Sequence, residues 1–92
     1  MRDSKTTLKI GYENMVSSHR ILAIVNPNSA PIKRMIKQAK ERMMLIDATG
    51  GKPTRSAIIA DTGHVILSSI SPAKLEKRMN GRGMGEVPIT SL

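Results

Sequence analysis

The residues of this chain that could do chemistry are cationic side chains, which outnumber the acids that could pair with them. Lys and Arg number 15 and Asp and Glu number 7, so the formal net charge is +8. Side chains of this kind bind phosphate, and nucleic acid is the commonest partner of a small basic domain, ahead of an anionic membrane surface. The densest group lies in residues 30–44, where Glu41 is the only acid: Lys33, Arg34, Lys37, Lys40 and Arg42.

Two interpretations of this basic segment stay open. If it is helical, its row of cations, with Lys33 and Arg34 at the front, can line up along DNA phosphates, and released counterions then drive binding. Alternatively it is a solvated surface helix whose charge keeps the protein soluble. Acids spaced at i, i+4 would neutralise a purely solvating helix, and they are nearly missing here, which favours the nucleic-acid interpretation.

The segment Gly50–Arg55, GGKPTR, is a second candidate for phosphate contact. Its glycines permit close approach of the backbone to a phosphate, and Lys52 and Arg55 supply charge. It is not a nucleotide-binding P-loop, because Pro53 stands where Ser or Thr must follow the lysine. Contact with a nucleic-acid backbone and an ordinary connection between strands remain as alternatives.

Arg20 is the third candidate, at the start of an expected strand. It could clamp a phosphate or read a base edge. The alternative is a salt bridge with an acid such as Asp47.

Catalytic and metal chemistry have little support in this sequence. There is no Cys, and no Ser stands in a G-x-S-x-G motif. His19 and His64 have no carboxylate at ligand spacing. We therefore expect no enzyme activity, no cofactor, no metal and no small-molecule substrate. The one aromatic residue, Tyr12, cannot form a stacking platform for single strands, so duplex DNA is the expected partner.

The elements that must position these cations follow from periodicity and turn residues. Five strands are expected at Thr6–Ile10, Arg20–Val25, Leu45–Thr49, Thr54–Asp61 and His64–Ile70, and helices at Ala30–Met44 and Pro72–Asn80. Ser29 is the expected N-cap of the first helix, and Pro31 fits its first turn. The expected fold class is α+β, in which one long basic helix packs on a small, mainly antiparallel sheet and a short C-terminal helix follows.

One small domain, residues 1–80, is expected, followed by a flexible tail at residues 81–92. With neither Phe, Trp nor Cys, so small a core needs support from self-association. Pro31, Met35 and Ile36 are expected to be structural or to lie at an interface between subunits. The sequence shows neither a secretory signal nor a membrane span, so a cytoplasmic, nucleoid-associated protein is expected.

Three strings together resemble the family of extracellular matrix regulatory protein A (RemA). They are SAPIKRM preceded by IVNP, the LIDAT element, and TRSAIIADTGHVILSSISP. The resemblance covers roughly Leu8–Met79. It implies a bacterial DNA-binding activator of genes for biofilm matrix and osmoprotection. It also implies DNA-binding platforms similar to LytTR-type domains, and subunits that assemble into closed, heptameric-type rings or stacked rings.

The resemblance also carries over to individual positions. Arg20 matches an arginine important for family function, and Pro31 matches a structural or interfacial proline. The family loop has adjacent arginines where this chain has Lys52 and Pro53, so one charge is kept and one is lost. Arg55 matches the family's T-R.

Two functional hypotheses follow. In the first, the protein is a ring-forming regulator that grips the backbone of duplex DNA through Arg20, Lys52 and Arg55, with Lys33 and Arg34. In the second, it is an oligomeric scaffold that binds protein or RNA and has lost DNA binding through the change at Pro53.

Overall fold

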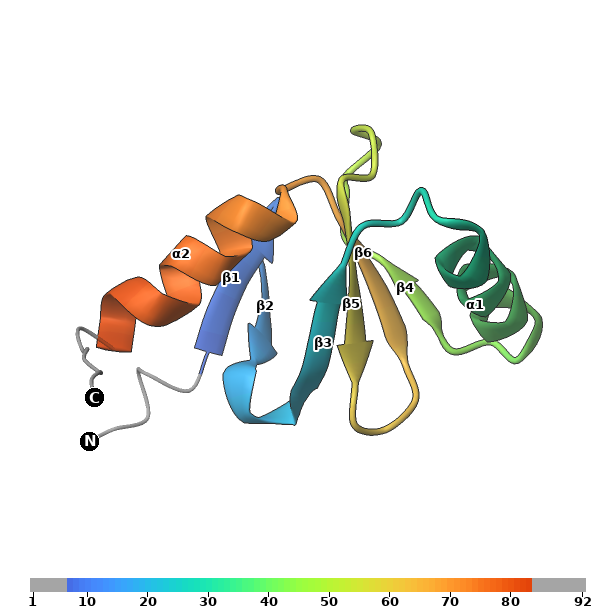
Figure 1. The fold of residues 1–92 in the computed structure, drawn as a ribbon, viewed down its shortest axis with the longest axis horizontal. Helices are drawn as coiled ribbons and strands as arrows, with labels where there is room; N and C mark the ends of the chain where they lie inside the picture. Colours follow the sequence, from blue (N-terminus) through green and yellow to red (C-terminus); the bar gives the residue numbers. More distant parts are fainter. Residues whose placement is uncertain (1–6, 84–92) are drawn as a thin grey trace.

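The computed structural model describes residues 7–83, with the side chains of residues 7–80. Its strands come in runs that are separated by two α-helices, which confirms the α+β class (Figure 1). In chain order they are β1 (Thr7–Gly11), β2 (Asn14–Ser17), the 3₁₀ turn η2 (Ser18–Arg20), β3 (Ile21–Val25), α1 (Ala30–Glu41), β4 (Leu45–Asp47), β5 (Ser56–Ala60), β6 (Val65–Ser68) and α2 (Pro72–Gly83).

The strands form two sheets instead of the single sheet that we predicted. The larger has the order β3-β5-β6-β4, and β1 and β2 form a separate hairpin. The β3–β5 and β5–β6 pairs are antiparallel, as the sequence predicts, whereas the edge strand β4 runs parallel to β6. Figure 1 shows α2 and the hairpin on one side of this sheet and α1 on the other.

Both faces of the larger sheet are buried. On one face Ile58 and Ile66, which are partners in the register of β5 and β6, pack with Leu75 of α2 and with β1. On the other face Ala57 and Val65 pack with Ala39 of α1. Side chains alternate along a strand, so one run of apolar residues supplies both layers. The apolar sequences of the inner strands follow from this three-layer arrangement.

Strand β3 shows how the register is kept. A bulge between Ile21 and Ala23 places Ile21 and Ile24 in the same apolar cluster, although three positions separate them. Val25 packs in the other cluster, so β3 is covered on both faces. Leu22, the residue in the bulge, is left 69% exposed.

Helix α1 ends three residues before the predicted Met44. Met43 has a left-handed φ of 61°, its N–H bonds to the Lys40 carbonyl, and the Met44 N–H bonds to the Ala39 carbonyl. These two bonds form a Schellman C-cap. The stop is not visible in the sequence, because methionine occupies the position where glycine usually stands. Continued helical spacing from Ile36 and Ala39 would put Met43 on the packed face, but after this stop its side chain is 91% exposed.

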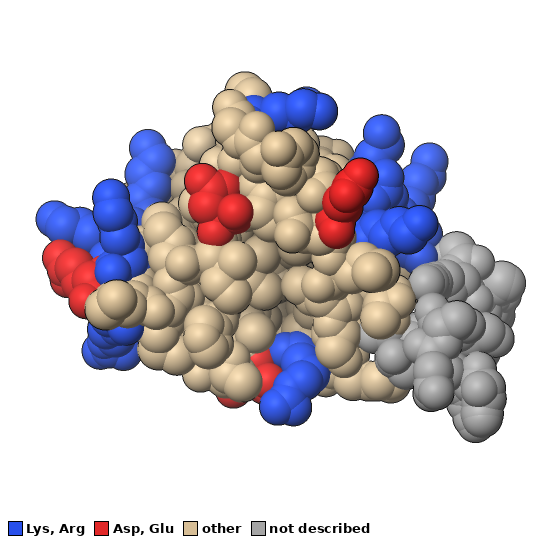
Figure 2. All heavy atoms as spheres, turned by 180° about the vertical axis from the view of Figure 1, so that it is seen from behind, with Lys and Arg blue, Asp and Glu red and all other residues tan. Residues whose placement is uncertain are grey.

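The prediction of one long basic helix and one short helix is also wrong. Each helix has 12 residues, because α1 ends early and α2 continues to Gly83. Each sequence carries four Lys or Arg and one Glu. Figure 2 shows Lys and Arg gathered at both ends of the molecule, over α1 and beside α2, and not on α1 alone. The remainder of the predicted tail, residues 84–92, lies outside the described residues.

Candidate functional site

A depression of about 740 Å³ lies at one end of the larger sheet, where three connections meet. They are the β3–α1 connection, the β4–β5 loop and the β6–α2 connection. Figure 1 shows these segments at the same end of the sheet, with the β4–β5 loop projecting above it. The residues that line the depression are Asn26, Asn28, Lys52, Pro53, Thr54, Arg55, Ser69, Ser71 and Pro72.

Two of the predicted phosphate contacts, Lys52 and Arg55, come together here, and none of the lining residues is an acid. Both side chains are exposed. The Arg55 N–H donates to the Ser68 carbonyl at 2.8 Å, which fixes the backbone of Arg55 beside β6. The depression is therefore lined by cationic side chains, and the backbone of Arg55 is hydrogen-bonded to the sheet.

A compact turn after β4 sets the path of Lys52. Thr49 donates to Asp47 Oδ1 from its N–H at 2.9 Å and from Oγ1 at 2.6 Å. The chain then passes through Gly50 (φ 63°) and Gly51 (φ 87°), and the Lys52 N–H returns to the Thr49 carbonyl at 3.1 Å. Both glycines thus adopt the left-handed backbone that other residues resist.

Asp47 is held ionised by this turn. The Thr49 hydroxyl, and then the Thr49 N–H, hold the pKa of Asp47 below its ordinary value, against a small opposing effect of burial. Hydrogen bonds to a carboxylate favour its charged form. Asp47 is thus committed to the turn, and it is not the acid that pairs with Arg20.

Both helices begin at this end of the sheet. Ser29 is the N-cap of α1, as predicted, although its side chain makes no capping bond. Asn28 and Asn26 form a turn before it, with the Asn28 N–H donating to Asn26 Oδ1 at 2.8 Å. At α2 the Ser71 hydroxyl accepts from the Lys74 N–H at 3.3 Å. The N-terminal ends of helices carry partial positive charge, which adds to that of Lys52 and Arg55.

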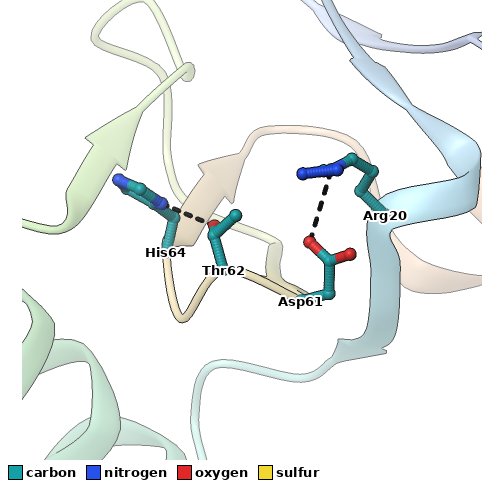
Figure 3. Close-up of polar contacts among 4 residues, drawn as sticks. All are labelled: Arg20, Asp61, Thr62 and His64. Carbon is teal, nitrogen blue, oxygen red and sulfur yellow. Dashed lines mark hydrogen bonds and ion pairs between the residues drawn. The ribbon is translucent and has the colours of Figure 1, made fainter.

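Arg20 lies at the opposite end of the sheet, where β3 begins. Since β3 has five residues, roughly 17 Å separate its two ends. Arg20 Nε lies 3.4 Å from Asp61 Oδ1, with the two side chains 59% and 41% exposed (Figure 3). The Asp61 N–H also donates to the Arg20 carbonyl at 2.8 Å. The salt bridge kept open as the alternative for Arg20 is therefore present, with Asp61 as the acid.

The histidines make no metal site in this structure. His64 Nδ1 lies 2.6 Å from Thr62 Oγ1 in the β5–β6 turn (Figure 3). Within residues 7–83, no three His, Asp or Glu side chains come together in a way that could hold a metal ion. No helix in the same range is long and apolar enough to cross a membrane.

The predicted residues of α1 divide into two groups. Ile36 packs against the sheet in the cluster of Ala57 and Val65. Pro31 is exposed in the first helical turn, and Met35 is 37% exposed. Lys33 and Arg34 are exposed in the first half of α1, which follows the β3–α1 connection.

Sequence reasoning missed the polar residues that complete the depression, namely Asn26, Asn28 and Ser71. A signal for them was present. Each lies between the end of a strand and the start of a helix, and such connections commonly carry binding residues. These three residues come together because of the order of the strands in the sheet, and that order cannot be read from the sequence.

Known proteins match most of this chain. A family model described as extracellular matrix regulatory protein A-like matches residues 7–79. A relative in Bacillus cytotoxicus named "Putative regulatory protein" is 53% identical over 75 residues, which are 82% of this chain and 86% of the relative. Relatives of the same name in Bacillus mycoides and Bacillus cereus match with the same identity and coverage.

Proposed function

The chain belongs to the extracellular matrix regulatory protein A-like (RemA-like) family, and on that premise we propose that it is a transcriptional regulator that binds duplex DNA as a homo-oligomer. The observation that supports this proposal most directly is the depression at the end of the sheet. It combines Lys52 and Arg55 with the start of α2 and with the connection that leads into α1, and none of its lining residues is an acid. An anionic group such as a backbone phosphate fits that combination.

The contact is made to the DNA backbone and not to exposed bases. The described surface offers one aromatic side chain, Tyr12, whereas single-strand binders use rows of aromatics for stacking. Lys33 and Arg34, exposed in the first half of α1, supply further cations on the helix that follows the β3–α1 connection. A contact through phosphates positions a protein on the duplex and carries little sequence information.

Self-association supplies the further phosphate contacts that one subunit lacks. Lys52 and Arg55 make two contacts, while Arg20 stands at the other end of the sheet beside Asp61. A closed ring repeats the same weak contact around its circumference and raises the overall affinity. The exposed Leu22 beside one sheet edge and the exposed Met43 and Ile46 beside the other offer two different apolar surfaces. Different surfaces on the two edges suit the head-to-tail contacts of a ring.

The first experiment measures the affinity for a duplex from 50 to 200 mM salt. If an assembly neutralises about six phosphates, affinity falls by about three decades across this range. We expect Lys52→Ala and Arg55→Ala to weaken binding and to flatten the salt dependence. Lys40→Ala is the matched control, because it removes the same charge near the far end of α1.

A flat salt response of the native protein, or equal effects of Lys40→Ala and Lys52→Ala, would contradict this proposal. Light scattering with and without the duplex tests the assembly. A particle of one subunit's mass, 10.0 kDa, at micromolar concentration would exclude the ring.

A second candidate function is an oligomeric scaffold that binds protein or RNA. It is favoured by Pro53 at a position of expected positive charge. It is also favoured by the centre of the face in Figure 2, which is largely free of Lys and Arg. The double variant Lys52→Arg, Pro53→Arg separates the two functions. The scaffold is supported if this variant gains a DNA affinity that the native chain lacks, and it is rejected if the native chain already binds.

A further inference from the structure

The only aromatic residue of the chain, Tyr12, lies against the loop that carries Lys52. Its ring covers Gly50 so closely that a Cβ added to Gly50 would come within 2.8 Å of Tyr12 Cε1 and nearer still to Cγ. A Cβ added to the neighbouring Gly51 would meet nothing within 4 Å. The contact is therefore specific to Gly50, two residues before Lys52.

The backbone around Tyr12 is held in an unfavourable conformation. Tyr12 and Glu13 form the turn between β1 and β2 with φ values of 49° and 62°. Hairpin turns of this geometry favour Asn-Gly, and bulky side chains resist positive φ. Asn14 stabilises the turn, since its Nδ2 donates to the Gly11 and Tyr12 carbonyls at 3.3 and 3.1 Å. Backbone strain of this kind often accompanies function.

The ring is not held in place by the core, because Tyr12 is 70% exposed. Burial of the side chain therefore does not account for a strained turn at this position. The strained turn instead places the flat ring of Tyr12 against the backbone of Gly50. That glycine belongs to a segment with two consecutive left-handed residues, Gly50 and Gly51, which has a high conformational freedom when unsupported.

We propose that Tyr12 is a positioning residue that holds the Gly50–Arg55 loop in the conformation in which Lys52 meets an anionic backbone. This inference rests on the proposed function for its DNA readout, but its structural part can be tested without DNA. The ring restricts Gly50 before binding, so the loop does not have to be ordered when DNA arrives. Tyr12 itself contributes no charge to the contact.

The absence of charge gives the proposal a distinctive signature. Tyr12→Ala should weaken DNA binding about tenfold, the effect of ordering roughly one extra backbone residue at the binding step. The slope of log affinity against log salt should stay the same, because the number of phosphates contacted is unchanged. Lys52→Ala, in contrast, should reduce that slope by about 0.9 for each lost contact. Tyr12→Phe keeps the ring and should bind as the native protein does.

The two glycines provide matched variants. Gly50→Ala and Gly51→Ala introduce the same kind of backbone strain at positive φ, but only the first also collides with Tyr12. Gly50→Ala should therefore be the more damaging of the two in DNA binding. In the Tyr12→Ala background this difference should disappear, because the colliding ring is gone. Additive effects of Tyr12→Ala and Gly50→Ala would overturn the proposal.

The loop itself is measured by NMR of the DNA-free protein labelled with ¹⁵N-glycine. We expect the order parameter of Gly51 to fall from about 0.85 to below about 0.6 in Tyr12→Ala, and to stay high in Tyr12→Phe. An unchanged Gly51 in Tyr12→Ala would overturn the proposal, as would a Tyr12→Phe protein that binds DNA as poorly as Tyr12→Ala. If the native protein does not bind DNA, the proposed function is rejected. The order parameter of Gly51 still shows in that case whether Tyr12 holds the loop.

Discussion

Replacing Ser68 by Ala should cost this domain a large share of its stability, although only one oxygen atom is removed. Ser68 is fully buried in β6, directly opposite the fully buried Ser56 of β5. Its hydroxyl donates to the Ile10 carbonyl at 2.7 Å and accepts from the Ile70 N–H at 3.1 Å. Ile10 is the residue that the bulge between Lys9 and Gly11 leaves out of the β1–β2 register. The hydroxyl thus joins the hairpin to the sheet at a point where no strand partner exists.

The magnitude follows from these two bonds. An unsatisfied buried polar group costs about 1–3 kcal/mol, and the Ile10 carbonyl loses its partner in a buried environment. The bond to Ile70 is only partly buried, so water replaces part of it. We expect a loss of about 2 kcal/mol in the free energy of unfolding, which lowers Tm by about 8–16 °C in a domain of this size.

The assay is urea unfolding followed by circular dichroism at one fixed protein concentration, because the stability of an oligomer depends on concentration. Ser17→Ala, at an exposed position of β2, is the matched control and should change the free energy by less than about 0.5 kcal/mol. If Ser68→Ala behaves like Ser17→Ala, the reasoning from buried hydrogen bonds is refuted.

Three further predictions concern the turn, the core and the ion pair. Thr49→Val removes the main hydrogen bond to Asp47, so the Asp47 pKa should rise towards its ordinary value in an NMR titration. The native bond contributes stability above the unfolded-state pKa of about 3.9, and that contribution is lost as pH falls through the lower folded-state pKa. The same Asp47 pKa in both proteins would contradict the predicted rise. Leu75→Ala, in the buried cluster under α2, should destabilise by about 2–5 kcal/mol in urea unfolding, and a loss below about 1 kcal/mol would show that α2 packs less tightly. Asp61→Asn should leave stability within about 1 kcal/mol but free Arg20 for phosphate, so DNA affinity at low salt should rise; a decrease would show that the pair, and not the free arginine, is needed.

Part of the candidate site could be predicted from residue types alone. Lys52 and Arg55 follow a pair of glycines in a short segment, and short-range chemistry of this kind does not depend on the fold. Arg20 could not be placed in the same way. Its distance from Lys52 depends on which end of β3 it occupies and on the order β3-β5-β6-β4, a long-range pairing that no local pattern encodes.

The helices and strands divide in the same way, into features that local sequence predicts and features that it does not. Runs of apolar residues, proline at a helix start and the turn residues Asp61-Thr62-Gly63 are local signals, so the sequence by itself determined the α+β class, the β5–β6 hairpin and the start of α1. Other features rest on contacts between distant segments: the parallel pairing of β4, the ring of Tyr12 on Gly50 and the serine hydroxyls inside the core. Only the tertiary structure decided these, because each costs free energy locally and is stabilised by partners that lie far away along the chain.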